Sequence, residues 1–229
     1  MLAVVVPAHN EESAIGDCIA SLHAAARCPR LHGERVLIVV SADACTDDTE
    51  GIARRCGAQV VRGAARNVGI ARASGAQRAL DAGARWLAFT DADSVVARDW
   101  FSSQLAQRAD AVCGTIEVDD WGDYNERVRQ HHLATYTDAD GHRHVHGANL
   151  GVTALAYQRA GGFKPLVSSE DVALVEALRD SGASIVWSAA PRVLTSARRR
   201  FRAPGGFGEA LARAEQQLSV HQVPRSAGA

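Results

Sequence analysis

The sequence lacks any apolar run near the roughly 20 residues that a membrane-spanning helix requires. Its N-terminal apolar stretch covers five residues after Met1 and has neither a basic lead nor a cleavage-site pattern, which argues against a signal peptide. A strong charge of one sign is also missing, because the formal net charge is −1, so no general field attracts nucleic acid. These absences predict a cytoplasmic protein that binds no nucleic acid.

Paired cysteines are missing as well. The sequence contains five cysteines, an odd number, and no CxxC motif, which argues against a disulfide framework and a structural zinc site. Free thiols in a reducing cytoplasm are the simpler interpretation. The chain has 229 residues, 47% hydrophobic and 22% charged, which is enough for one α/β domain with a full core.

Short apolar runs alternate with longer amphipathic stretches in the first half of the chain. Strands are predicted over 2–6, 36–40, 59–62 and 86–89, with helices over 13–26, 46–56 and 67–83. The second half predicts strands over 111–118 and 185–188, an extended segment over 144–153, and helices over 124–135, 171–181 and 207–218. Apolar strands that alternate with helices are typical of a mostly parallel sheet with helices on both faces, so we predict the α/β class.

The tetrapeptide TDAD occurs twice, at residues 90–93 and 137–140. The first copy directly follows the apolar run 86–89, and parallel sheets bind ligands at the carboxyl ends of their strands. Two carboxylates in such a loop could coordinate a divalent cation together with phosphate oxygens, although helix capping is the plainer interpretation. The second copy is closed by Gly141 and predicts a solvated turn.

Other polar motifs follow the predicted strands in a fixed order. They are VVVPAHNEE (4–12), SADACTDDT (41–49), ARNVG (65–69) and TDADS (90–94), followed by HGANLGV (146–152), AGGF (160–163) and SSED (168–171). Over about residues 2–200 this series closely resembles glycosyltransferase family 2. The resemblance implies the GT-A fold, a single Rossmann-like domain, and transfer of a sugar from a nucleotide-sugar to an acceptor hydroxyl.

The resemblance also implies a division of the chain. A GT-A domain would cover 1–202, with a nucleotide-sugar-binding half over 1–110 and an acceptor-binding half over 111–202. A C-terminal helix and a flexible tail would fill 203–229. No transmembrane segment is expected, and the acceptor and the oligomeric state stay open.

Site residues are implied by the same motifs. Asp91 and Asp93 resemble a metal pair for Mg²⁺ or Mn²⁺, and Asp93 is the better candidate for direct coordination. Asp171 resembles the general base of an inverting displacement, and Glu170 resembles its partner in the Glu-Asp pair of the family. The plainer alternative is that Ser-Ser-Glu-Asp only caps the N-terminus of the following helix. The donor, a UDP-sugar or GDP-sugar, would contact Pro7, His9, Asn10, Glu11, Asp43, Arg66, Asn67, Asp91, Ala92, Asp93, Gly147, Asn149, Arg198 and Arg200.

Several of these roles have plainer alternatives. Asp43 lies in Ala-Asp-Ala-Cys, where the family commonly has paired aspartates and then Gly-Ser, so the base stays open between uracil, guanine and others. Asp43 could also be a helix-entry residue and Arg66 a surface arginine. The basic run at 198–202 either contacts the diphosphate or faces solvent or an anionic membrane.

His142, His144 and His146 alternate and so share one face of an extended chain. Histidines suit softer metals than the cation expected at Asp91 and Asp93, so a second metal site is an alternative to contact between His146 and the substrate.

Two rival functions remain open at this stage. The run WLAFTDADSVV also resembles a haloacid-dehalogenase-type phosphatase with Asp91 as nucleophile and Asp93 as acid. Such enzymes need a lysine beside the sheet, and the only lysine here, Lys164, lies in a Gly-Gly-Phe-Lys-Pro turn. The other rival is a catalytically inactive nucleotide-binding module, and a retaining enzyme is the alternative within the glycosyltransferase hypothesis.

Overall fold

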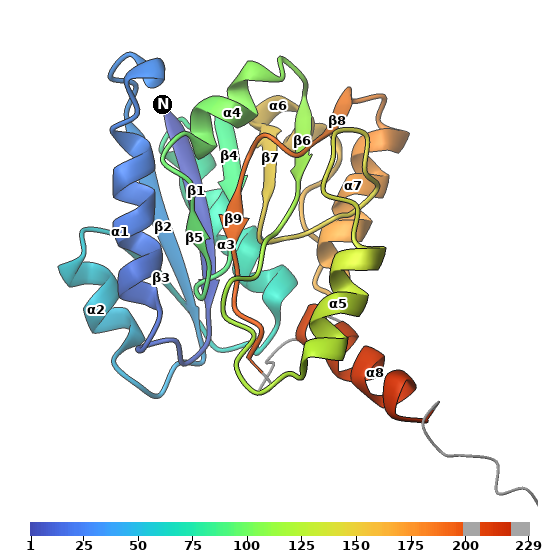
Figure 1. The fold of residues 1–229 in the computed structure, drawn as a ribbon. Coiled ribbons are helices and arrows are strands. Elements are labelled where there is room, and N and C mark those ends of the chain that lie inside the picture. The colour runs from blue at the N-terminus through green and yellow to red at the C-terminus, as the bar shows by residue number, and fades with distance from the viewer. Residues whose placement is uncertain (199–206, 221–229) are drawn as a thin grey trace, which may run out of the picture.

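A seven-stranded sheet forms the centre of the computed structural model, which describes residues 1–198 and 207–220 (Figure 1). Its strands are β1 (Leu2–Ala8), β2 (Val36–Asp43), β3 (Gln59–Gly63), β4 (Trp86–Phe89), β6 (Ala111–Gly114), β7 (Leu150–Thr153) and β8 (Ile185–Ser188). They lie in the order β3-β2-β1-β4-β7-β6-β8. Only β7 runs antiparallel to its neighbours, which confirms the predicted mostly parallel sheet.

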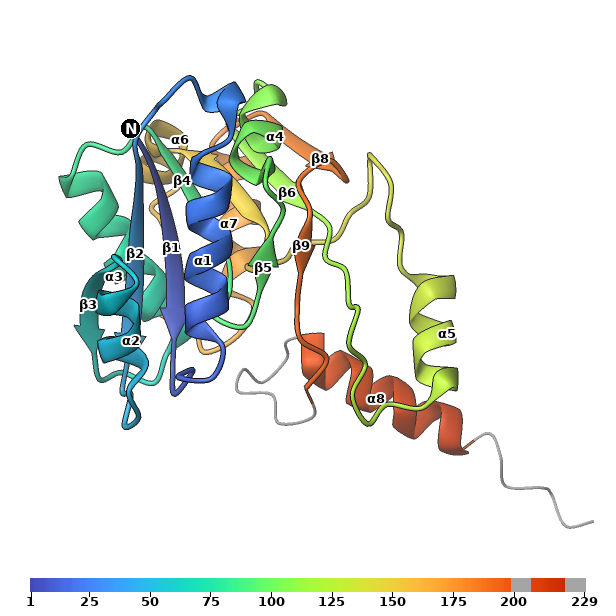
Figure 2. The ribbon, with the colours of Figure 1, turned by 60° about the vertical axis from the view of Figure 1, so that its left-hand side comes forward.

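Helices cover both faces of this sheet, as predicted (Figures 1 and 2). Leu2, Val4 and Val6 pack with α1 (Ile15–Ala26), α2 (Thr49–Arg55) and α4 (Trp100–Ala106). Ala3 and Val5 point the other way, toward α3 (Val68–Asp81), α6 (Ala154–Arg159) and α7 (Glu170–Asp180). Side chains alternate along a strand, so an all-apolar β1 serves two cores at once.

Several short elements were not predicted. Helices α4 and α6 have seven and six residues, too few to show a clear helical period. A two-residue ribbon pairs β5 (Val95–Val96) with β9 (Val193–Leu194). The predicted strand over 111–118 ends at Gly114, because the chain then leaves the sheet and Glu117 bonds to the β9 segment. A single 3-10 turn (Pro29–Leu31) follows α1.

The second half adds a pair of helices beside the sheet. Helix α5 (Glu126–Thr135) packs on α8 (Phe207–Val220) around a small core of Tyr124, Val128, Ala197 and Leu211 (Figure 2). Helix α8 confirms the helix predicted over 207–218, whereas the predicted flexible tail lies outside the described residues. Within the described ranges, no helix is both long and apolar enough to cross a membrane.

Strand direction decides where the polar loops meet. The carboxyl ends of β1, β2 and β4 point to one edge of the sheet because these strands are parallel. Strand β7 is antiparallel to β4, so its amino end, with the preceding residues 146–149, reaches the same edge. This edge therefore collects motifs from both halves of the chain.

Helix α3 approaches the sheet closely at Gly75. A Cβ atom added there would overlap Cγ1 of Val5 and lie 2.5 Å from Oγ of Ser41. The separation between α3 and the sheet is therefore set by the absence of a side chain at this position.

We expect Gly75→Ala to lower the free energy of unfolding by about 1–3 kcal/mol, because overpacking forces α3 away from β1 and β2. Urea denaturation measures this change. The neighbouring exposed Ser74→Ala is the control and should shift stability by no more than about 0.5 kcal/mol. Equal stability of the two variants would show that α3 does not rest tightly on the sheet.

Candidate active site

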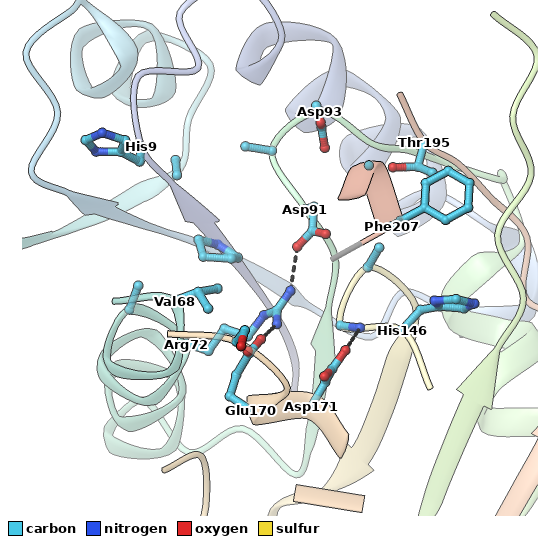
Figure 3. A pocket seen from close by; sticks show the side chains of 18 of the residues that line it. His9, Val68, Arg72, Asp91, Asp93, His146, Glu170, Asp171, Thr195 and Phe207 are labelled. Carbon is cyan, nitrogen blue, oxygen red and sulfur yellow. Dashed lines mark hydrogen bonds and ion pairs between the residues drawn. The ribbon is translucent and has the colours of Figure 1, made fainter. Parts of the chain in front are cut away.

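A cavity of about 820 Å³ opens at the edge where the motifs meet (Figure 3). Most of the predicted site residues line it: Pro7, His9, Glu11, Asp43, Arg66, Asn67, Asp91, Ala92, Asp93, Gly147, Glu170, Asp171 and Arg198. The first half contributes the loops after β1, β2 and β4, and the second half contributes the segments before β7 and α7. The cavity is thus built by both halves.

The deepest polar group in the cavity is the guanidinium of Arg72, on helix α3 (Figure 3). Arg72 is 3% exposed. Its Nη2 donates to Oδ1 of Asp91 at 2.5 Å, and its Nη1 donates to Oε1 of Glu170. A Cβ at residue 147 would overlap the guanidinium, so Gly147 is the residue that makes room for it.

Arg72 was not among the predicted site residues, although the sequence contains a signal for it. Ala71, Arg72, Gly75, Ala76 and Ala79 are all buried and repeat at helical spacing. A charged residue on such a face is rarely buried unless it is paired, so its position alone indicated a nearby carboxylate.

A second cluster joins two carboxylates to one arginine at the mouth of the cavity. Arg198 donates Nη1 and Nη2 to Glu11 at 2.8 and 2.6 Å, and its Nη2 lies 3.0 Å from Oδ2 of Asp93. The pKa of Asp93 is raised to about 6, above all by burial and also by the nearby charges of Asp91 and Glu11, against the opposing effect of Arg198. Its charged form is therefore disfavoured in the folded protein despite the ion pair with Arg198.

Asp171 lies in the first turn of α7 and faces the cavity. Its Oδ2 accepts from the N–H of Gly147 at 2.7 Å, and its Oδ1 accepts from its neighbour Val172 at 2.8 Å. A carboxylate oxygen has two acceptor sites, so each oxygen keeps one for a further donor. Ser169 precedes the helix, as expected, but its side chain makes no capping hydrogen bond.

Asp43, which also lines the cavity, shapes the loop that carries Arg66. Its two carboxylate oxygens accept from the N–H groups of Ala65 and Asn67, both at 2.7 Å. Asn67 in turn caps helix α3 and donates to the carbonyl of Pro165 at 3.1 Å. Asp43 is therefore at least a loop anchor, and its predicted contact with a nucleotide base stays a prediction.

Two of the predicted donor contacts, Asn10 and Asn149, do not line the cavity. Asn149 is fully buried, accepts from the Trp100 indole at 2.8 Å, and donates to the carbonyls of Thr115 and Pro191. Both amide hydrogens are donated to backbone carbonyls and the side chain is fully buried, so the structure gives it an architectural role instead. The Asn10 carbonyl accepts from the N–H of Thr46 at 2.7 Å and joins two loops outside the cavity lining. Arg200 lies outside the described residues.

The alternating histidines form a stack rather than a metal site. The rings of Tyr136 and His144 are 4.2 Å apart and nearly parallel, and His146 Nε2 lies 3.0 Å from the Tyr136 hydroxyl. Burial lowers the pKa of all three histidines, that of His146 to about 3, so their rings are neutral. Throughout residues 1–198 and 207–220, no cluster of three or more His, Cys, Asp or Glu is arranged to hold a metal ion.

The second TDAD copy is more than the solvated turn that was predicted. Asp138 accepts from Arg192 at 2.6 Å and from Thr115 at 2.8 Å. Asp140 accepts from the hydroxyl of Ser188 at 2.9 Å and from a backbone N–H at 2.8 Å. These carboxylates fasten the turn to the chain that follows β8.

The sequence comparison decides the family. The model of glycosyl transferase family 2 matches residues 3–163. This chain belongs to glycosyl transferase family 2. A search of curated proteins found no match. The resemblance on which the site prediction was based is thereby confirmed.

Solved structures show the same fold at low identity. TarS 1-349 of S. aureus, in complex with UDP-GlcNAc, is 15% identical with a TM-score of 0.66 over 96% of this chain and 65% of that one. PcManGT, a mannosyltransferase from Pyrobaculum calidifontis in complex with GDP-Man and Mn²⁺, is 22% identical with a TM-score of 0.65 over 96% and 62%.

A third similar structure is glucosyl-3-phosphoglycerate synthase from Mycobacterium tuberculosis in complex with Mn²⁺, UDP and glucosyl-3-phosphoglycerate. It is 18% identical, with a TM-score of 0.57 over 96% of this chain and 78% of that one. These likenesses confirm the GT-A fold. The present family 2 chain spans less than two thirds of the length of the TarS and PcManGT structures named above.

We expect Arg72→Met to lower the free energy of unfolding of this family 2 chain by about 3–5 kcal/mol, because it leaves Asp91 and Glu170 without their shared cation. Urea denaturation of Arg72→Met and of Arg78→Met, an exposed arginine of the same helix, makes the comparison. The double variant Arg72→Met/Glu170→Gln should regain part of the loss. Equal stability of the two single variants would contradict a central role for Arg72.

We expect Asp93→Asn to stabilise the metal-free protein at about pH 8 by on the order of 2 kcal/mol. The pKa of Asp93 is raised from 3.8 to about 6 in the folded protein, so its charged form destabilises the fold. The destabilisation by charged Asp93 is absent below pH 3.8, grows between pH 3.8 and about 6, and is complete above about pH 6. The stability gained by Asp93→Asn should therefore be smaller near pH 4.5 than at about pH 8.

Melting in the presence of a chelator, at both pH values, measures this gain. Asp81→Asn, an exposed carboxyl on α3, is the control and should change stability by no more than about 0.5 kcal/mol at either pH. A gain that is the same at both pH values would refute the assignment of the raised pKa to Asp93.

Proposed function

We propose that this chain transfers a sugar from a nucleotide-sugar to an acceptor hydroxyl, with inversion at the anomeric carbon and with Mg²⁺ or Mn²⁺. The observation that carries the proposal is that Asp91, Asp93 and Asp171 line one cavity between the two halves of the fold. A transferase of this kind needs charge neutralisation at the diphosphate and a base at the acceptor, and the cavity offers candidates for both.

We assign the nucleotide to residues 1–110 and the acceptor to residues 111–202. On the nucleotide side, Pro7, His9, Asp43 and Arg66 line the cavity. The TarS structure contains UDP-GlcNAc and the PcManGT structure contains GDP-Man, which supports a UDP-sugar or a GDP-sugar as donor here. The five cysteines are all free, which suits the cytoplasm as the compartment.

The residues present fit a hard divalent cation. Asp91 and Asp93 both line the cavity, and the nearby charges of Asp91 and Glu11 help to raise the pKa of Asp93, which a bound cation would lower. Mg²⁺ typically binds one or two protein carboxylates and takes its other ligands from water and substrate phosphates. When bound, the cation would neutralise charge on the departing diphosphate.

The remaining chemistry falls to residues of this chain. Asp171 takes the proton of the acceptor hydroxyl as that oxygen forms its bond to the anomeric carbon. The bond between the anomeric carbon and the diphosphate breaks, and the nucleoside diphosphate leaves with the electron pair. The Gly147 N–H orients the Asp171 carboxylate, and Arg72 fixes the start of α7 through Glu170.

The rival functions have less support. A haloacid-dehalogenase-type phosphatase needs a lysine at the nucleophile, but Lys164 is exposed and does not line the cavity. An inactive nucleotide-binding module would not require the metal pair and the base candidate, which are all present.

We expect a donor nucleotide-sugar with Mn²⁺ to raise the melting temperature, because ligands stabilise the state that binds them. Asp171→Asn should keep this shift while the release of nucleoside diphosphate falls by about 10²- to 10⁴-fold. Asp180→Asn, an exposed carboxyl of the same helix, is the control and should keep both. Hydrolysis of phosphomonoesters with no shift by any nucleotide would favour the phosphatase instead.

A further inference from the structure

Exposed apolar side chains gather beside Asp171. Large apolar side chains are exposed at seven of the described positions, and three of these, Leu166, Val167 and Val172, lie within seven residues of the chain. Val167 is 57% exposed and Val172 40%, and both line the cavity. We call these two residues the apolar rim. The residue proposed as the base therefore sits next to surface that water solvates poorly.

Apolar side chains also face the cavity from other segments. Ile116 follows β6, Val145 precedes β7, and Phe207 begins α8 (Figure 3). Phe207 is held by its edge-on contact with the His132 ring, at 5.5 Å between centroids. We call Ile116, Val145 and Phe207 the apolar wall.

We propose that the acceptor is an alcohol with an apolar body, which packs on the apolar rim and wall and presents its hydroxyl to Asp171. This inference rests on the proposed function and deepens it by naming the acceptor class. Ligand cavities obtain most of their affinity from apolar lining and their orientation from a few polar groups. Here Asp171, which lines the cavity together with Val167 and Val172, is the polar group that would orient the alcohol.

A series of straight-chain alcohols from butanol to octanol tests the proposal. Each alcohol is titrated into the protein with its donor and Mn²⁺, below its solubility limit and without lipid, so that single molecules are measured. Any saturable change in the release of nucleoside diphosphate gives an apparent affinity. We expect that affinity to rise about three- to fourfold per added methylene, as for burial of apolar surface.

Methyl glucoside and glycerol phosphate are the polar and charged comparisons, and neither should saturate in the concentration range of octanol. The proposal is overturned if affinity does not change with chain length, or if either polar compound saturates first. Because donor binding is read separately from the melting shift, a failed donor shift counts against the proposed function, and a donor shift without this length dependence counts against the acceptor class alone.

Variants of the rim localise the effect. Val167→Ser and Val172→Ser change exposed side chains, so folding is not at risk, and each should weaken the apparent affinity for octanol by about threefold or more. The matched control is Leu155→Ser on α6, a side chain also 57% exposed but at the opposite edge of the sheet. Equal affinities for octanol in rim and control variants would place the alcohol elsewhere and overturn the proposal.

Discussion

One buried guanidinium connects the two halves of this fold at the cavity. Arg72 belongs to α3 in the first half, whereas Glu170 opens α7 in the second, and Asp91 follows β4. Loss of one member of a buried ion pair leaves a charge without compensation, so these groups are fixed as a unit. The positions of the Asp91 loop and of the first turn of α7 therefore depend on a single side chain.

The cluster at the mouth of the cavity differs from this unit in one respect. Burial and neighbouring carboxylates raise the pKa of Asp93 although Arg198 lies 3.0 Å away. Such strain is typical of functional sites, where stability is sacrificed to keep a group ready for a ligand. The Arg72 unit therefore serves the framework, whereas Asp93 carries a charge that the fold itself disfavours.

The strands that carry the cavity could be predicted from the sequence because β1, β2 and β4 are apolar on both faces. Asp91 could be placed at the cavity because it lies two residues after the end of β4. The sequence could not predict the role of Asn149, whose partners Trp100 and Pro191 lie 49 and 42 positions away. Local pattern carries no information about such distant contacts, and the pairing of Asp138 with Arg192 was hidden for the same reason.

The small ribbon of β5 and β9 connects the chain segments that carry Asp93 and Arg198. Strand β5 begins two residues after Asp93, and β9 ends four residues before Arg198. The antiparallel pairing of these strands holds the loop of Asp93 beside the segment that leads to Arg198. The separation between Asp93 and Arg198 therefore depends on this pairing as well as on their ion pair.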